Sequence, residues 1–83
     1  MRTTDVLFEL GAEYSVRVID KECVVYRDFG AFDVEISGLD THRAGCTVYV
    51  WAKTPALHIA EIHTVKSLES LKAVLAEIER LRG

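Results

Sequence analysis

Alternating apolar and polar residues fill the middle of the chain and predict a series of β-strands. The clearest run is 32–37, in which Asp33 and Glu35 alternate with aliphatic and aromatic residues. Because successive side chains of a strand point to opposite faces, both carboxylates are expected on an outward, solvated face. The other predicted strands, separated by turn residues, are 14–19, 23–29, 46–53 and 57–62.

Toward the C-terminus the apolar residues recur with the helical period of 3.6. Leu68, Leu71, Leu75 and Ile78 fall near one line, and Ser67 is a favourable N-cap. The connections between the predicted strands are short, which favours antiparallel pairing of consecutive strands as a meander. The helix has to bury its apolar stripe, and the aliphatic face of the sheet is the available partner.

Residues 3–10 predict a short N-terminal helix, with Thr3 or Thr4 as its N-cap and Gly11 at its end. A strand is the alternative for this segment. No linker or repeat divides the chain, so we predict one small α+β domain over residues 1–83. It consists of about five antiparallel strands in a meander with the C-terminal amphipathic helix on one face, with or without the N-terminal helix.

The composition is that of an ordinary folded domain and excludes several functional classes. The 83 residues are 49% hydrophobic and 28% charged, which is too apolar for a disordered chain. The net charge of −3 offers no dense positive surface, so direct nucleic-acid binding is not expected. No apolar run reaches the ~20 residues of a membrane span, and the start lacks a signal-peptide run. We therefore expect a cytoplasmic protein with no membrane partner.

The two cysteines are not expected to form a disulfide. Cys23 and Cys46 fall on predicted strands that are separated by a third strand. This places their Cα atoms about 9–10 Å apart, at about 4.8 Å per strand. A disulfide tolerates at most about 7 Å between Cα atoms. We predict two reduced, buried thiols in an intracellular protein.

The histidines and cysteines do not have the spacing of a metal site. His42 and Cys46 form one H-x3-C pair, whereas a structural zinc site normally shows two closely spaced ligand pairs. His58 and His63 are five residues apart, so a regular strand would point them to opposite faces. We expect no metal ion and no cofactor.

The sequence contains two candidate catalytic arrangements. A nucleophilic Cys46 would need a lowered pKa, which His42 and Arg43 could provide if they lay close to it. Cys46 is expected on the same face of its strand as the inward-facing valines, so a packed thiol is the preferred interpretation.

Asp33 and Glu35 could act as an acid–base pair only if burial separated their pKa values. On a solvated strand they form an acidic rim instead.

Tyr49 and Trp51 are the most informative residues of the chain. They are two apart in the strand 46–53 and share one face, with valines on the other face. If the valines face the core, the aromatic pair faces outward, where large aromatic residues commonly mark a contact surface. The alternative is a buried pair, because small domains usually enclose their only tryptophan.

The predicted function is that of a small non-enzymatic protein-binding module, an adaptor or an inhibitor of a larger protein. Inhibitors of host nucleases from phages and mobile elements are analogous in size and in their lack of motifs. The acidic rim favours a partner with a basic face. The candidate partner-binding residues are Tyr49, Trp51, Asp33, Glu35, Arg17, His42 and Arg43. The alternatives are a homodimer formed through edge strands or the aromatic face, and a small enzyme that uses Cys46 and His42.

Overall fold

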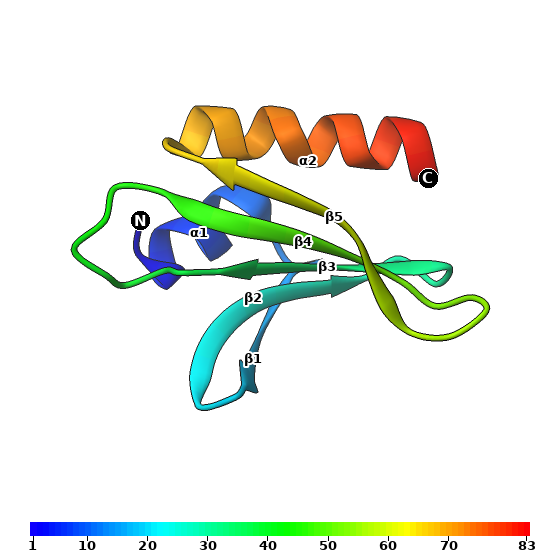
Figure 1. Cartoon of the computed structure of the whole chain (residues 1–83). Coiled ribbons are helices and arrows are strands. Elements are labelled where there is room, and N and C mark those ends of the chain that lie inside the picture. Colours follow the sequence, from blue (N-terminus) through cyan, green and yellow to red (C-terminus); the bar gives the residue numbers. More distant parts are fainter.

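Five strands form one open antiparallel sheet in the order β1-β2-β3-β4-β5, with one helix before it and one after it (Figure 1). The computed structural model describes all residues, 1–83. The elements are α1 (Thr3–Leu10), β1 (Ser15–Ile19), β2 (Glu22–Asp28), β3 (Phe32–Ser37), β4 (Cys46–Ala52), β5 (His58–Val65) and α2 (Leu68–Arg82). The predicted α+β class, the meander and both helices are confirmed. The fifth strand continues to Val65, three residues beyond its predicted end.

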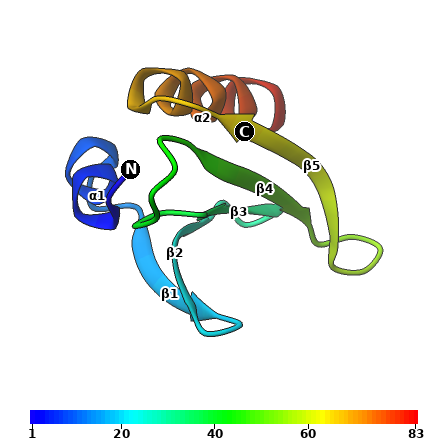
Figure 2. The same cartoon turned by 60° about the vertical axis from the view of Figure 1, so that its left-hand side comes forward.

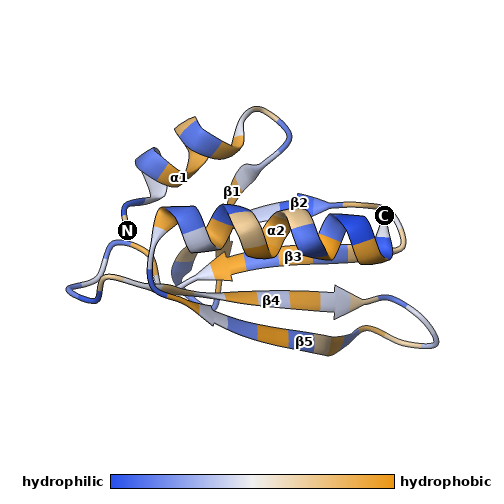
Figure 3. Cartoon of the chain, turned by 90° about the horizontal axis from the view of Figure 1, so that it is seen from above, coloured by the Kyte–Doolittle hydropathy of each residue, from blue (hydrophilic) through white to orange (hydrophobic).

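Both helices lie on the same side of the sheet (Figures 2 and 3). α1 packs on β2, α2 contacts β5, and an ion pair of 3.4 Å between Lys72 and Glu9 joins the two helices. No element covers the opposite side of the sheet, which we call the outer face. Neither helix has the length and apolar content that a membrane span needs.

The core lies between the helices and the sheet. Val34 on β3 and the valines Val48 and Val50 on β4 are completely buried there. From α2, Leu71 and Leu75 pack into the same cluster. Of the two alternatives that the sequence left open, the aliphatic face of β4 is therefore the core face, and the aromatic residues of that strand lie on the outer face.

The two helices begin in different ways. Ser67 caps α2 as predicted, because its Oγ accepts a hydrogen bond of 3.1 Å from the backbone N–H of Ser70. The prediction of a threonine cap for α1 is wrong. Asp40, from the β3–β4 loop, accepts hydrogen bonds from Thr3 N (2.9 Å) and Thr3 Oγ1 (2.7 Å). A residue far along the chain thus caps α1, which ends at Gly11 as predicted.

The prediction that both thiols are buried is correct for only one of them. Cys46 is buried at the start of β4, whereas Cys23 is exposed. Cys23 pairs with Val18 of β1, a residue that is itself 70% exposed. The helices do not extend over this end of the sheet, so an inward-pointing side chain there still contacts water.

Candidate functional site

The outer face buries polar side chains although no helix covers it. Asp33 and Glu35 are each only 7% exposed, so the prediction that they are solvated is wrong. Tyr26 on β2 and Trp51 on β4 flank them and hydrogen-bond to them from the neighbouring strands. The β1–β2 hairpin also bends away from α2, toward the outer side (Figure 1). This curvature lets side chains on the outer face cover one another.

The carboxylate of Asp33 is held by groups from two directions. The hydroxyl of Tyr26 donates a hydrogen bond of 2.5 Å to Oδ2. The ammonium of Lys53 lies 3.0 Å from Oδ1 and 2.8 Å from Oδ1 of Asp28, yet Oδ1 of Asp33 accepts no well-directed hydrogen bond. Burial and the hydrogen bond to Asp33 raise the pKa of Tyr26 to about 12. Tyr26 therefore acts as a donor throughout the physiological pH range.

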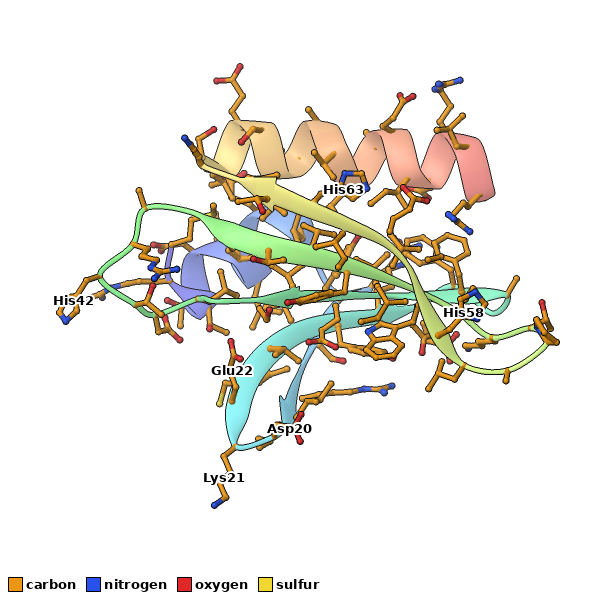
Figure 4. All side chains as sticks on the ribbon, viewed as in Figure 1. Asp20, Lys21, Glu22, His42, His58 and His63 are labelled. Carbon is orange, nitrogen blue, oxygen red and sulfur yellow. The ribbon has the colours of Figure 1, made fainter.

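The carboxylate of Glu35 has fewer partners. The indole N–H of Trp51 donates a hydrogen bond of 3.0 Å to its Oε1. Burial raises the pKa of Glu35, and the negative charges of Glu22 and Asp20 raise it further, against the hydrogen bond from Trp51 that lowers it. Figure 4 shows Asp20 and Glu22 at the β1–β2 turn. Glu35 is thus a buried acid without a neighbouring cation to balance its charge.

The aromatic pair lies on the outer face, and both side chains are half-buried. Strand pairing places Ile62 opposite Tyr49 and Ile59 opposite Trp51. Ile59 is 42% exposed and Ile62 is 61% exposed. These four residues form a partly exposed apolar strip along β4 and β5, which we call the apolar strip.

The contribution of β5 to this strip could not be recognised from the sequence pattern. Ile59 and Ile62 are three residues apart, so a regular strand would point them to opposite faces. A β-bulge in β5, opposite the step from Val50 to Trp51, brings both isoleucines to the outer face. No turn residue or glycine in β5 marks the bulge.

Arg17, one of the candidate partner-binding residues, also lies on the outer face. Its guanidinium carbon is 3.9 Å from the centroid of the Tyr26 ring, within the range of a cation–π contact. The face therefore already holds one guanidinium against an aromatic ring, next to the buried Asp33.

His42 and Arg43 lie apart from this face, in the β3–β4 loop. The imidazole of His42 points into solvent at the end of the loop (Figure 4), and no hydrogen bond joins it to Cys46. Burial raises the pKa of the Cys46 thiol, which is the opposite of what a nucleophile needs. The structure does not bring the predicted cysteine–histidine pair together.

The prediction that His58 and His63 point to opposite faces of the sheet is wrong, because the same bulge shifts the register of β5. His58 pairs with Ala52 and His63 with Val48, so both project toward the helix side of the sheet. They lie at separate places along β5 (Figure 4), and His63 contacts Glu61 at 2.9 Å. No group of three or more histidine, cysteine, aspartate or glutamate side chains is arranged to hold a metal ion.

Comparisons with protein-family models, with curated proteins and with solved structures find no match to this chain. Its function has to be inferred from the chemistry of its own surfaces. The outer face is the most distinctive of them, because it combines half-buried aromatic rings, exposed isoleucines and buried carboxylates on a side of the sheet that no element covers.

Proposed function

We propose that this protein is a small non-enzymatic protein-binding module, an adaptor or inhibitor that binds a larger protein through its outer face. The observation that carries the proposal is the partial exposure of Tyr49 and Trp51 on a sheet face that no helix covers (Figure 2). Aromatic side chains of this kind supply much of the binding energy in protein interfaces, because they bury a large area at a low entropic cost.

The apolar strip supports the same proposal. Ile59 and Ile62 extend the aromatic pair to the edge of the sheet, and both lose contact with water when a partner covers them. Burial of apolar surface is the main source of free energy in protein association. The strip would form the centre of the interface.

The partner is expected to present a basic residue beside the strip. Glu35 accepts one side-chain hydrogen bond, from Trp51, and its charge is not balanced by a nearby cation. A lysine or arginine of the partner would supply that cation and a charge-assisted hydrogen bond. Glu22 and Asp20 add negative charge on the same side of Glu35, which favours the approach of a basic surface.

Affinity capture with matched variants tests the proposal. The immobilised protein is compared with Tyr49→Ser/Trp51→Ser and with Phe8→Ser, which changes an aromatic residue that is 87% exposed on α1. We expect one or more proteins to be retained by the wild type and by Phe8→Ser, and to be lost with the double variant. Equal retention by all three would contradict binding through the outer face.

The captured partner then allows a direct measurement. Trp51 is the only tryptophan, so the fluorescence of the protein reports on the outer face. A partner without tryptophan, or one studied as a tryptophan-free fragment, should shift the emission to the blue and protect it from a collisional quencher. Unchanged quenching in the complex would place the contact elsewhere on the molecule.

A homodimer is the second candidate, and the free edge of β5 favours it. β5 is eight residues long, ends the sheet without a neighbour and carries Ile59 and Ile62. Long edge strands with exposed apolar side chains readily pair with another copy. Light scattering separates the two candidates, because a concentration-independent dimer that Ile62→Lys disrupts supports self-association. A monomer leaves the outer face available to a different protein.

A further inference from the structure

A cavity lies at the end of the sheet where β4 begins and β5 ends. Its volume is about 430 Å³, which is within the range of small-molecule sites. The lining residues that matter here are Arg43, Ala44, Thr47, Thr64 and Lys66. None of the residues of the apolar strip lines this cavity, so its chemistry can be considered independently of the proposed partner.

The charged residues of the cavity are all cations. Arg43 and Lys66 line it, and no aspartate or glutamate does. Neither cation forms an ion pair, although the protein carries a net charge of −3 and acidic residues are in excess. Of the remaining lysines and arginines, five form ion pairs (Arg27, Lys53, Lys72, Arg80 and Arg82) and three do not (Arg2, Arg17 and Lys21). Two unpaired cations at one cavity favour an anionic ligand.

The neutral residues of the cavity fit the same kind of ligand. Thr47 and Thr64 face each other across β4 and β5, and neither hydroxyl makes a hydrogen bond to another protein group. A hydroxyl donates readily to a carboxylate or phosphate oxygen. Ala44, which is exposed and lines the cavity, adds an apolar contact for the body of an organic molecule.

The loop that forms one wall is fixed at both of its ends. Glu22 Oε2 accepts a hydrogen bond of 2.6 Å from the backbone N–H of Gly38, and Asp40 is bonded to Thr3. At the other end Gly45 lies so close to β5 that a Cβ there would be 2.2 Å from the carbonyl oxygen of Val65. The cavity is therefore formed before a ligand arrives, which limits the entropic cost of binding.

We propose that this cavity binds a small organic anion, a compact molecule that carries a carboxylate or a phosphate group. Arg43 and Lys66 neutralise the charge of that group, and the hydroxyls of Thr47 and Thr64 donate hydrogen bonds to its oxygens. The apolar part of the ligand contacts Ala44. Carboxylates and phosphates share this recognition chemistry, and a titration with one probe of each kind distinguishes them.

An NMR titration of the ¹⁵N-labelled protein tests the site with three probes: inorganic phosphate, phenyl phosphate and benzoate. We expect saturable shifts of the amide signals of Gly38, Gly45, Thr47 and Thr64, with at least one organic probe binding more tightly than inorganic phosphate. Tighter binding of phenyl phosphate would indicate a phosphate ligand, and tighter binding of benzoate would indicate a carboxylate ligand. Shifts that do not saturate, or that spread over unrelated parts of the molecule, would overturn the proposal.

Variants locate the binding and separate it from the function proposed above. Arg43→Gln/Lys66→Gln should weaken the best probe by about tenfold or more, whereas Lys21→Gln, on the exposed β1–β2 turn, should not. Thr64→Val removes one hydroxyl and should weaken binding of the same probe. Thr64→Ser keeps the hydroxyl and should bind the probe as the wild type does. Tyr49→Ser/Trp51→Ser should leave probe binding unchanged. Wild-type affinity in both the Arg43→Gln/Lys66→Gln and the Thr64→Val variants would refute the site.

Discussion

Nε1 of Trp51 lies 3.0 Å from Oε1 of Glu35, so the only tryptophan of the chain holds a buried carboxylate on the outer face. The same hydrogen bond fixes the indole against β3 while leaving its ring partly exposed. A contact residue that is already immobilised loses little entropy when a partner covers it. The hydrogen bond between Trp51 and Glu35 thus joins the aromatic contact residue of the outer face to its buried carboxylate.

Glu35→Gln should stabilise the protein at neutral pH, because Gln keeps an acceptor for Trp51 without the charge. Burial, with Glu22 and Asp20, raises the folded-state pKa of Glu35 above its ordinary value of 4.5. The protonated side chain therefore favours folding, and this contribution is complete below pH 4.5 and is lost as pH rises through the folded-state pKa. Urea unfolding of the variant and the wild type, at neutral pH and below pH 4.5, measures the difference in their free energies of unfolding. A variant that is no more stable than wild type at neutral pH would contradict the prediction.

Tyr26→Phe should destabilise the protein by about 1–3 kcal/mol, because it removes the donor to a buried oxygen of Asp33. Tyr49→Phe is the matched control, since the Tyr49 hydroxyl makes no hydrogen bond within the protein. Its effect should stay within about 0.5 kcal/mol. Denaturant unfolding of the two variants provides the comparison, and equal losses of stability would show that the Tyr26–Asp33 bond contributes nothing specific.

Leu75→Ala should cost about 2–5 kcal/mol of unfolding free energy, because Leu75 is only 6% exposed between α2 and the sheet. The control is the same substitution on the same helix at Leu81, which is 66% exposed. Leu81→Ala should change stability by less than about 0.5 kcal/mol. A comparable loss in both variants would mean that helix propensity, and not burial, dominates.

Asp40→Asn should lower the melting temperature at neutral pH, because it weakens the cap of α1. Hydrogen bonds from Thr3 lower the pKa of Asp40 from its ordinary 3.8. Its contribution is present above pH 3.8 and is lost as pH falls through the lowered folded-state pKa. Asn tolerates the positive φ of 59° at this position. Asp20→Asn, which also has a positive φ and lies in an exposed turn, should have a smaller effect in the same thermal scans.

The two thiols should react at different rates with a mild alkylating reagent. Cys23 is exposed and should be labelled rapidly, whereas Cys46 is buried and burial raises its pKa. Mass spectrometry of the native protein should show one fast modification per chain, which Cys23→Ser removes. Rapid labelling of Cys46 in the folded Cys23→Ser variant would revive the hypothesis of a nucleophilic cysteine.

The elements of the fold were predictable where the pattern is local and regular. The alternation in β3 and β4 correctly separates the core face from the outer face, and the 3.6-residue period correctly identifies α2. Prediction fails where one residue interrupts the period. The bulge in β5 inverts the expected faces of Ile59 and of His58 relative to the rest of the strand, and nothing in the local sequence indicates it.

The candidate site was predictable in its members but not in its chemistry. Alternation placed Tyr49, Trp51, Asp33 and Glu35 on one face, as found. It could not reveal that the two carboxylates are buried, because their cover comes from Tyr26 and from the curvature of the sheet. A strand pattern describes which face a side chain is on and contains no information on how strongly that face is bent.

By itself, the sequence determined the succession of the five strands and the C-terminal helix along the chain, and which residues of β3 and β4 share a face. These follow from backbone geometry, which imposes a period of 2 or 3.6 on residues that share an environment. Only the tertiary structure decided that Asp40 caps a helix 37 residues away and that Asp33 and Glu35 are buried. Such features depend on contacts between segments far apart in the chain, which local periodicity does not encode.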